Sequence, residues 1–200
     1  MTRRGRPRSF DRDTALQAMM EVFWTRGYEG AQLVDLTAAA GIAPPSFYAA
    51  FASKEQAFCE SVDHYIATVG ARPIAVFNQA PTLAQGVAQM LEASITVALS
   101  TEPGGCLLIL GVVNCLPENE RARDYLKAAR QKTRQLIYLR LERAQLEGEL
   151  PAECDLAQYA AFIHGALQMI SFQARDGASR QQLEALIAPT LAALQMPLSG

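Results

Sequence analysis

The chain has 200 residues, half of them apolar, and a formal net charge of −2 at pH 7. This length and apolar content allow one large domain, or a small domain joined to a larger one, and exclude an intrinsically disordered protein. The longest apolar run, residues 106–113, is too short to cross a bilayer, so we expect no membrane partner.

Positive charge is concentrated at the start of the chain. Residues 1–12 hold five arginines against a single aspartate, a net charge of +4, which leaves −6 on the other 188 residues. Only the surface that touches DNA has to be positive, so a basic arm on an acidic body is compatible with DNA binding. No export signal follows Arg3 and Arg4, and the four cysteines form no CxxC pair, so a cytoplasmic location is expected.

The apolar spacing predicts helices almost everywhere, and no alternating strand pattern exceeds a few residues. The fold class is therefore all-α. The first helix is expected to begin at Asp11, which can cap it, and to end before Gly27; a capping box of Ser53 and Gln56 starts a fourth helix that runs towards residue 70. The other helices are predicted at about 33–40, 44–51, 82–101, 106–115, 119–147, 155–175 and 179–195, the last one kinked at Pro189.

Residues 32–56 have the layout of a helix-turn-helix. A short apolar helix is followed by Gly41, which can adopt the positive φ of a tight turn, and then by a second short helix anchored by Phe47 and Phe51. Such a unit presents its second helix to the major groove of DNA. The sequence therefore predicts duplex DNA as a partner.

The run from Phe10 to Phe58 resembles the N-terminal domain of TetR-family transcriptional regulators. The matching pieces are Ala15-Leu16, Val22-Phe23, Gly27-Tyr28, Leu36 to Ile42, Ser46-Phe47-Tyr48, Phe51 and Ser53-Lys54-Glu55. The resemblance implies a homodimer that binds a near-palindromic operator as a repressor and leaves it when a small-molecule effector enters the C-terminal domain. We expect a basic arm at 1–9, a three-helix DNA-binding domain at 10–55 and a helical effector-binding and dimerisation domain at 56–200.

The resemblance also suggests which residues touch DNA. By position, the family's DNA contacts fall on Pro44, Pro45, Ser46, Tyr48 and Lys54. Many family members have Thr or Ser where Ala31 and Gln32 stand; Gln32 can replace part of that phosphate contact and Ala31 cannot. Ala49 and Ala50 leave the third helix with few groups that read bases, so direct readout in the major groove should be thin.

The basic arm contains a second DNA-binding pattern. Arg4-Gly5-Arg6-Pro7 resembles the core of an AT-hook, in which an extended arginine pair enters a narrow, A·T-rich minor groove. The alternative is a basic tail whose arginines make nonspecific phosphate contacts. Arg4 and Arg6 contact DNA in both interpretations.

The predicted helix at 155–175 carries two apolar stripes. One follows Leu156, Ala160, Ile163 and Leu167, and the other consists of Tyr159, Phe162, Ala166 and Met169. One stripe can face the core of its own chain and the other a partner, so we expect dimerisation through the helices at 155–175 and 179–195. A helix buried on both sides within one chain is the alternative.

We expect the effector to bind among the helices at 82–116 and 155–175, with Asn114, His164 and Gln168 as polar contacts. Cys106 follows two glycines at a predicted helix start, where the helix dipole favours a thiolate. It is either a redox or electrophile sensor or a buried structural cysteine. The basic stretch 121–143, with eight basic and two acidic residues, is interpreted as a solvated helix face; an acidic ligand or attraction of DNA are the alternatives.

No catalytic constellation is present in the sequence: no Ser-His-Asp or Cys-His arrangement, phosphate loop or carboxylate pair stands out. We therefore predict a protein that is not an enzyme and that needs no cofactor or metal. A helical protein-interaction module that no longer binds DNA is a further alternative, and it would show no salt-dependent DNA affinity.

Overall fold

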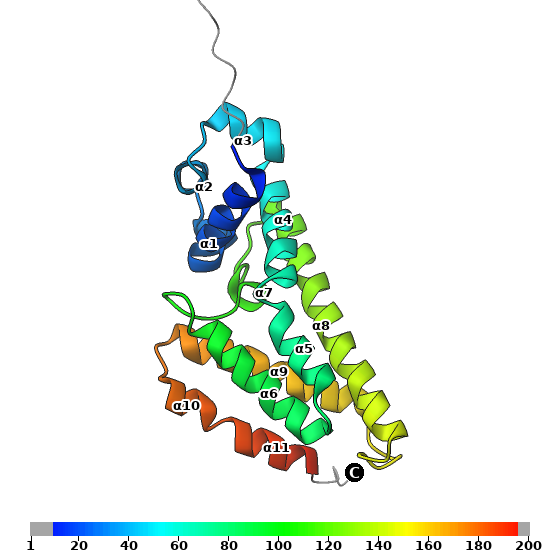
Figure 1. Cartoon of the computed structure of the whole chain (residues 1–200). Coiled ribbons are helices and arrows are strands. Elements are labelled where there is room, and N and C mark those ends of the chain that lie inside the picture. Colours follow the sequence, from blue (N-terminus) through cyan, green and yellow to red (C-terminus); the bar gives the residue numbers. More distant parts are fainter. Residues whose placement is uncertain (1–9, 196–200) are drawn as a thin grey trace, which may run out of the picture.

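The computed structural model describes residues 10–195, and over this range the chain is helical without strands, as predicted (Figure 1). Arg4 and Arg6, and with them the AT-hook resemblance, lie outside the described residues. Within residues 10–195, no helix is both long and apolar enough to span a membrane.

The helix-turn-helix occupies one end of an elongated molecule (Figure 1). It consists of α1 (Arg12–Gly30), α2 (Leu33–Ala40) and α3 (Pro44–Phe51), and α4 (Lys54–Ala67) runs from it into the rest of the chain. Asp11 caps α1 as predicted, because its carboxylate accepts from the backbone N–H groups of Asp13 and Thr14. Ser53 caps α4 in the same way, through the N–H of Gln56.

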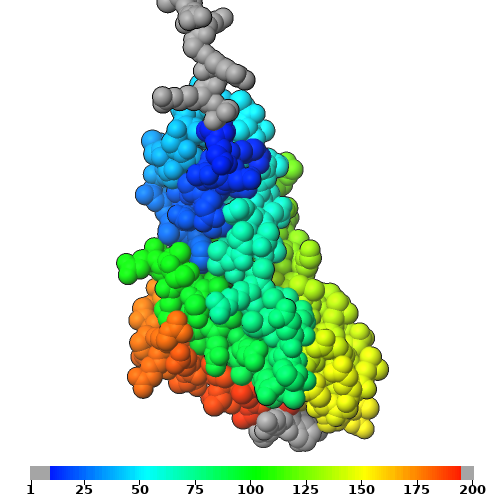
Figure 2. All heavy atoms as spheres, viewed as in Figure 1, coloured from blue at the N-terminus to red at the C-terminus, as the bar shows by residue number. Residues whose placement is uncertain are grey.

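The larger part of the molecule is a bundle in which α8 runs from beside α4 to the far end, with α6 and α9 lying next to each other and α10 and α11 at the end away from the helix-turn-helix (Figure 1). In the space-filling view, both parts form one continuous body (Figure 2). The helices are α5 (Ala71–Gln79), α6 (Leu83–Ala98), α7 (Leu107–Leu110), the 3-10 helix η1 (Pro117–Asn119), α8 (Glu120–Leu146), α9 (Leu156–Arg175), α10 (Arg180–Glu184) and α11 (Ile187–Gln195).

Two prolines begin helices that the sequence analysis did not place correctly. Helix α5 was not predicted, and Pro73 lies in its first turn. The single kinked helix predicted at 179–195 is wrong: the chain forms α10 and α11, with Pro189 in the first turn of α11. Proline is tolerated at both positions for the same reason: a backbone N–H in the first turn of a helix has no acceptor within the helix, so its absence costs no hydrogen bond.

The helix predicted at 106–115 is also wrong in length, since α7 ends at Leu110. The next carbonyl, that of Gly111, accepts a hydrogen bond from the backbone N–H of Tyr28 in α1, at 2.7 Å. The chain therefore leaves the helix where it is tied to the helix-turn-helix domain.

The molecule has two apolar cores. One contains the buried side chains of α5, α6, α8, α9, α10 and α11. The other is formed by α1 to α4 and also takes in Leu107 of α7, Val112, and Ala122 and Leu126 of α8. The helix-turn-helix domain thus shares its core with α7 and the start of α8.

Candidate DNA-binding surface and effector cavity

Helices α2 and α3 are held by their buried faces. Leu36, Phe47 and Phe51 are buried, and Gly41 ends α2 with φ of 64°, the left-handed conformation predicted for the turn. The opposite side of α3 presents Pro44, Pro45, Ser46 and Tyr48 to solvent. This surface has the shape of a major-groove reader: one short, exposed helix on a rigid support.

Tyr48 is the most prominent side chain of this surface, with 53% of its area exposed. Its ring packs edge-to-face against that of Phe47, with the centroids 5.5 Å apart and the planes at 86°. Since Phe47 is buried, the tyrosine ring has a fixed base while its hydroxyl is accessible to a phosphate or a base edge.

Gln32 precedes α2 and is exposed, as a phosphate contact requires. Its backbone N–H donates to the carboxylate of Asp35 at 3.0 Å, and its side-chain amide donates to the carbonyl of Glu29 at 3.4 Å. Ala31 is fully buried in the core, so its side chain is not accessible for a contact with DNA.

Lys54 is the first residue of α4, where the helix dipole also favours an anion. Its ammonium lies 4.4 Å from the centroid of the Tyr28 ring, and burial lowers the pKa of Lys54. In the free protein, the lysine is therefore held on an aromatic surface beside the helix-turn-helix rather than extended into solvent.

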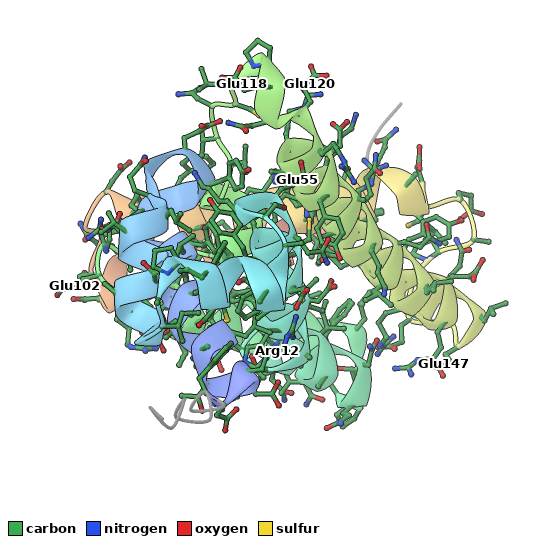
Figure 3. All side chains as sticks on the ribbon, turned by 90° about the horizontal axis from the view of Figure 1, so that it is seen from above. Arg12, Glu55, Glu102, Glu118, Glu120 and Glu147 are labelled. Atoms are coloured by element: carbon green, nitrogen blue, oxygen red, sulfur yellow. The ribbon has the colours of Figure 1, made fainter. Side chains whose placement is uncertain are left out.

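Arg12 packs against the helix-turn-helix. Its side chain, labelled in Figure 3, forms an ion pair with Glu60 of α4. The Arg12 guanidinium also lies 4.6 Å from the centroid of the Phe51 ring. Arg26 likewise pairs with Asp35 at 2.7 Å, joining α1 to α2. These two arginines brace the helix-turn-helix, a role that charge counting along the sequence could not reveal.

A cavity of about 80 Å³ lies between α4, α5, α6, α7, α8 and α9. A space of roughly 10–15 Å³ by this measure holds one water, so this cavity is large enough for a small organic molecule. Apolar residues make up more than half of its lining, and the polar lining residues are Tyr65, Ser94, Cys106, Arg130, Thr133, His164 and Ser171.

The four residues predicted to contact an effector fall in different places. Cys106 and His164 line the cavity; Asn114 and Gln168 do not. Asn114 is exposed in the segment after α7, because that helix is short, and Gln168 is half-buried on α9, whose cavity-facing residues include Leu167 and Ser171.

Sequence reasoning missed Tyr65, Arg130 and Thr133, which come from α4 and α8. All three lie on amphipathic helices, but the pattern of a single helix does not tell which neighbour it packs against. The excess of positive charge at 121–143 is the one signal that pointed to Arg130, through the alternative of an acidic ligand.

Cys106 is fixed at the cavity wall. Its Sγ accepts a hydrogen bond from the Tyr65 hydroxyl at 3.2 Å, and its backbone N–H donates to Ser171 Oγ at 2.7 Å. Burial raises the pKa of the Cys106 thiol, and it raises that of Tyr65 as well. Burial therefore opposes the thiolate that the helix dipole alone would favour at this position.

The segment that carries Cys106 in the cavity wall is joined to α1 by hydrogen bonds. Trp24 Nε1 donates to the carbonyl of Gly105 at 2.7 Å, next to Cys106, and the Tyr28 N–H donates to Gly111 on the other side of α7. Arg175 adds a third connection, from Nε to the carbonyl of Gly104 at 2.7 Å and from Nη2 to the carbonyl of Trp24 at 3.3 Å. Segment 104–111 thus connects the cavity to the helix-turn-helix domain.

No group of three or more His, Cys, Asp or Glu side chains within residues 10–195 is arranged to hold a metal ion.

Comparison with known proteins agrees with the architecture. Residues 15–59 match the family model described as bacterial regulatory proteins, tetR family, and residues 84–191 match the one described as tetracyclin repressor-like, C-terminal domain. The HTH-type transcriptional repressor ComR of Escherichia coli (strain K12) is 33% identical over 190 residues, covering 94% of this chain and 90% of ComR.

Solved structures extend the similarity to three dimensions. A cysteine mutant of the TetR family transcriptional regulator CifR, complexed with 26-bp double-strand operator DNA, is 43% identical, with a TM-score of 0.90 and coverage of 94% of this chain and 99% of that one. A TetR regulator from Rhodococcus sp. RHA1 is 34% identical, with a TM-score of 0.61 and coverage of 92% and 98%. By sequence, domain content and fold, the chain belongs to the TetR family of bacterial regulatory proteins.

Proposed function

We propose that this protein is a transcriptional repressor that binds a near-palindromic operator as a homodimer and is released by a small molecule in the cavity. The observation that carries the proposal is the braced helix-turn-helix, which exposes Tyr48, Ser46 and both prolines of α3 on one surface. ComR is named a repressor, and CifR is described in complex with operator DNA, which supports the same role here. A repressor acts on the chromosome, so the proposal includes the predicted cytoplasmic location.

In the proposed DNA complex, α3 lies in the major groove and Tyr48 and Lys54 contact phosphates. Gln32 adds a phosphate contact at the start of α2, and Arg4 and Arg6 of the arm reach the adjacent minor groove or backbone. Because few base-reading groups project from α3, part of the selectivity is expected to come from DNA shape and from the spacing of two half-sites.

The proposed dimer forms through α9 and the α10–α11 pair. Of the second apolar stripe predicted on α9, Tyr159 and Ala166 are buried in the chain's own core. The exposed apolar side chains of α9 are instead Phe162, Met169 and Phe172, at 45%, 38% and 45%. Gly165 lies between them with nothing within 4 Å of the position of a Cβ, which leaves room for the close approach of a second helix.

Release follows a population shift. Operator DNA favours one spacing of the two α3 helices, about one turn of duplex apart, and an effector among the C-terminal helices favours another. The shift can pass through α4, which carries Tyr65 at the cavity and Lys54 near the DNA, and through segment 104–111, which is bonded to α1. A difference in effector affinity of roughly 1–3 kcal/mol between the two states changes operator affinity about 5- to 150-fold.

The test is fluorescence anisotropy of the purified protein on the intergenic DNA beside its own gene, against scrambled DNA, across a salt series. Tyr48→Ala should abolish the preference for the intergenic DNA, whereas Leu139→Ala, which truncates another exposed side chain on α8, should retain it. Wild-type binding with no selectivity at any salt concentration would contradict the operator proposal, and no salt-dependent affinity at all would favour the protein-interaction module.

A thiol-based sensor that uses Cys106 is the second candidate, favoured by the placement of this cysteine in the cavity wall beside Tyr65. Mild hydrogen peroxide followed by mass spectrometry tests it. A sensor would gain mass at Cys106 and lose operator affinity in parallel, and Cys106→Ala would keep its affinity. Loss of affinity without modification of Cys106 would exclude this candidate.

A further inference from the structure

Among the arginines of α8, Arg130 and Arg134 form no ion pair with a carboxylate of the described residues, and of these two only Arg130 is half-buried, since Arg134 is exposed. Arg121, Arg123, Arg140 and Arg143 each pair with a carboxylate. No carboxylate of the described residues lies within 4.0 Å of the Arg130 guanidinium, whose one hydrogen bond there runs from Nη1 to the carbonyl of Leu108, at 2.8 Å. The guanidinium is half-buried in the cavity wall, so its charge is partly desolvated without a counter-charge.

The residues around Arg130 also leave its positive charge without a counter-charge. Among the described residues, neither Asp nor Glu lines the cavity. Burial lowers the pKa of Arg130, and burial together with the positive charges of Arg134 and Arg130 lowers the pKa of His164, so nothing in the wall neutralises the site. Seen from the helix-turn-helix end, Glu102, Glu118 and Glu147 lie at the rim of the molecule (Figure 3).

The apolar side chains of the cavity wall restrict which kind of anion can bind there. Side chains of Ile74, Val97, Leu167 and Ile170 line the cavity together with other apolar groups. A hydrated inorganic ion would leave this surface without a partner, whereas an organic anion covers it and removes it from water. One guanidinium matches one carboxylate in charge and in its planar arrangement of donors.

We propose that the effector of this protein is a small organic carboxylate, whose anionic end pairs with Arg130 beside His164 and whose apolar body lies against Val97, Leu167 and Ile170. The inference rests on the proposed function, since it names the ligand class of the same cavity.

Arg130 also connects the anion site to the helix-turn-helix domain. A bound carboxylate and the Leu108 carbonyl are competing acceptors for the same guanidinium, and Leu108 belongs to α7 within segment 104–111. This segment is bonded to Trp24 and Tyr28 of α1 on either side of α7. Loosening the bond to Leu108 therefore releases the wall of the cavity that is tied to the DNA-binding domain.

The test is isothermal titration calorimetry of the full chain with matched pairs of probes: hexanoate, octanoate, benzoate and phenylacetate, each against its primary amide. Loss of a charge-assisted hydrogen bond lowers affinity roughly 10- to 100-fold, so at least one carboxylate should bind that much more tightly than its amide. Arg130→Gln should remove the preference and Arg130→Lys should retain part of it. Lys132→Gln, which removes the same charge from an exposed position on α8, should behave as the wild type.

Equal affinities for carboxylate and amide, no binding by any carboxylate, or an unchanged preference in Arg130→Gln would each overturn the proposal. Circular dichroism of each variant checks that it folds. Operator binding is measured separately by anisotropy, with and without the carboxylate. A protein that binds its operator but no carboxylate refutes only the ligand class, whereas selective carboxylate binding without operator binding refutes only the repressor.

Discussion

Replacing Gly27 by alanine tests whether the bend in α1 fixes the helix-turn-helix domain against the cavity wall. Gly27 has φ of 68° and ψ of 174° inside α1, a conformation that is open to glycine alone and costs other residues about 1–3 kcal/mol. An alanine Cβ would also lie 3.2 Å from the carbonyl oxygen of Gly111. That oxygen accepts from the Tyr28 N–H at 2.7 Å, a bond whose loss costs about 0.5–1.5 kcal/mol more.

Gly27→Ala should therefore lower the free energy of unfolding by about 2–4 kcal/mol, and lower Tm by roughly 5–15 °C for a chain of this length. Urea and thermal unfolding followed by circular dichroism measure both quantities, at equal protein concentration because association adds to apparent stability.

Gly30→Ala is the matched control for this substitution. Gly30 is in the same helix, its φ is not positive, and its Cβ would meet only the Arg26 Cβ at 3.5 Å. The control should change stability by less than about 1 kcal/mol, and in the stabilising direction if at all. Equal stabilities of the two variants would refute the argument that the bend requires glycine.

Two further predictions concern the dimer and the cavity. Phe162→Glu, which places a charge on the exposed face of α9, should shift the protein from dimer to monomer in light scattering after size-exclusion chromatography; an unchanged dimer would place the interface elsewhere. The pKa of His164 is lower in the folded chain than its ordinary value of about 6.5. As the pH falls through that value, the imidazole is therefore protonated in the unfolded chain before it is protonated in the folded chain. The free energy of unfolding falls as a result. His164→Gln should thus lose less stability than the wild type between pH 7 and pH 5 in urea unfolding, and parallel losses would show that this histidine carries none of the pH dependence.

The sequence predicted the helices of the DNA-binding domain well because the sequence signals for them are local. The cap at Asp11, the turn at Gly41 and the spacing of Phe47 and Phe51 each depend on a few neighbouring residues, and all three are present in the structure. The errors arose where a local signal has two meanings. A proline such as Pro73 breaks a helix in its interior but begins one in its first turn, and the sequence alone did not distinguish the two.

The cavity could be predicted only in part, because it depends on which helix faces are brought together. Cys106 and His164 lie on segments expected to surround an effector, and both line the cavity. Asn114 was misplaced because α7 ends early, at the point where the next carbonyl accepts a hydrogen bond from Tyr28, more than eighty residues away along the chain. Arg130 was one of eight basic residues in its stretch, and only packing shows which of them faces inward.

The position of the cavity bears on how one small ligand can act on a distant DNA surface. The two apolar cores meet where α4, α7 and α8 pack together, and the cavity is lined from these same elements. A ligand there contacts Tyr65 of α4, which continues back to Lys54, and segment 104–111, which is hydrogen-bonded to α1. Helices α1 to α4 share one core, and ion pairs join α1 to α4 (Arg12–Glu60) and α1 to α2 (Arg26–Asp35), so in the proposed mechanism the helix-turn-helix domain moves as one rigid unit. The proposed coupling then requires no chain of small adjustments through the DNA-binding domain, because a change in the angle of that unit would alter the distance between the two α3 helices of the proposed dimer.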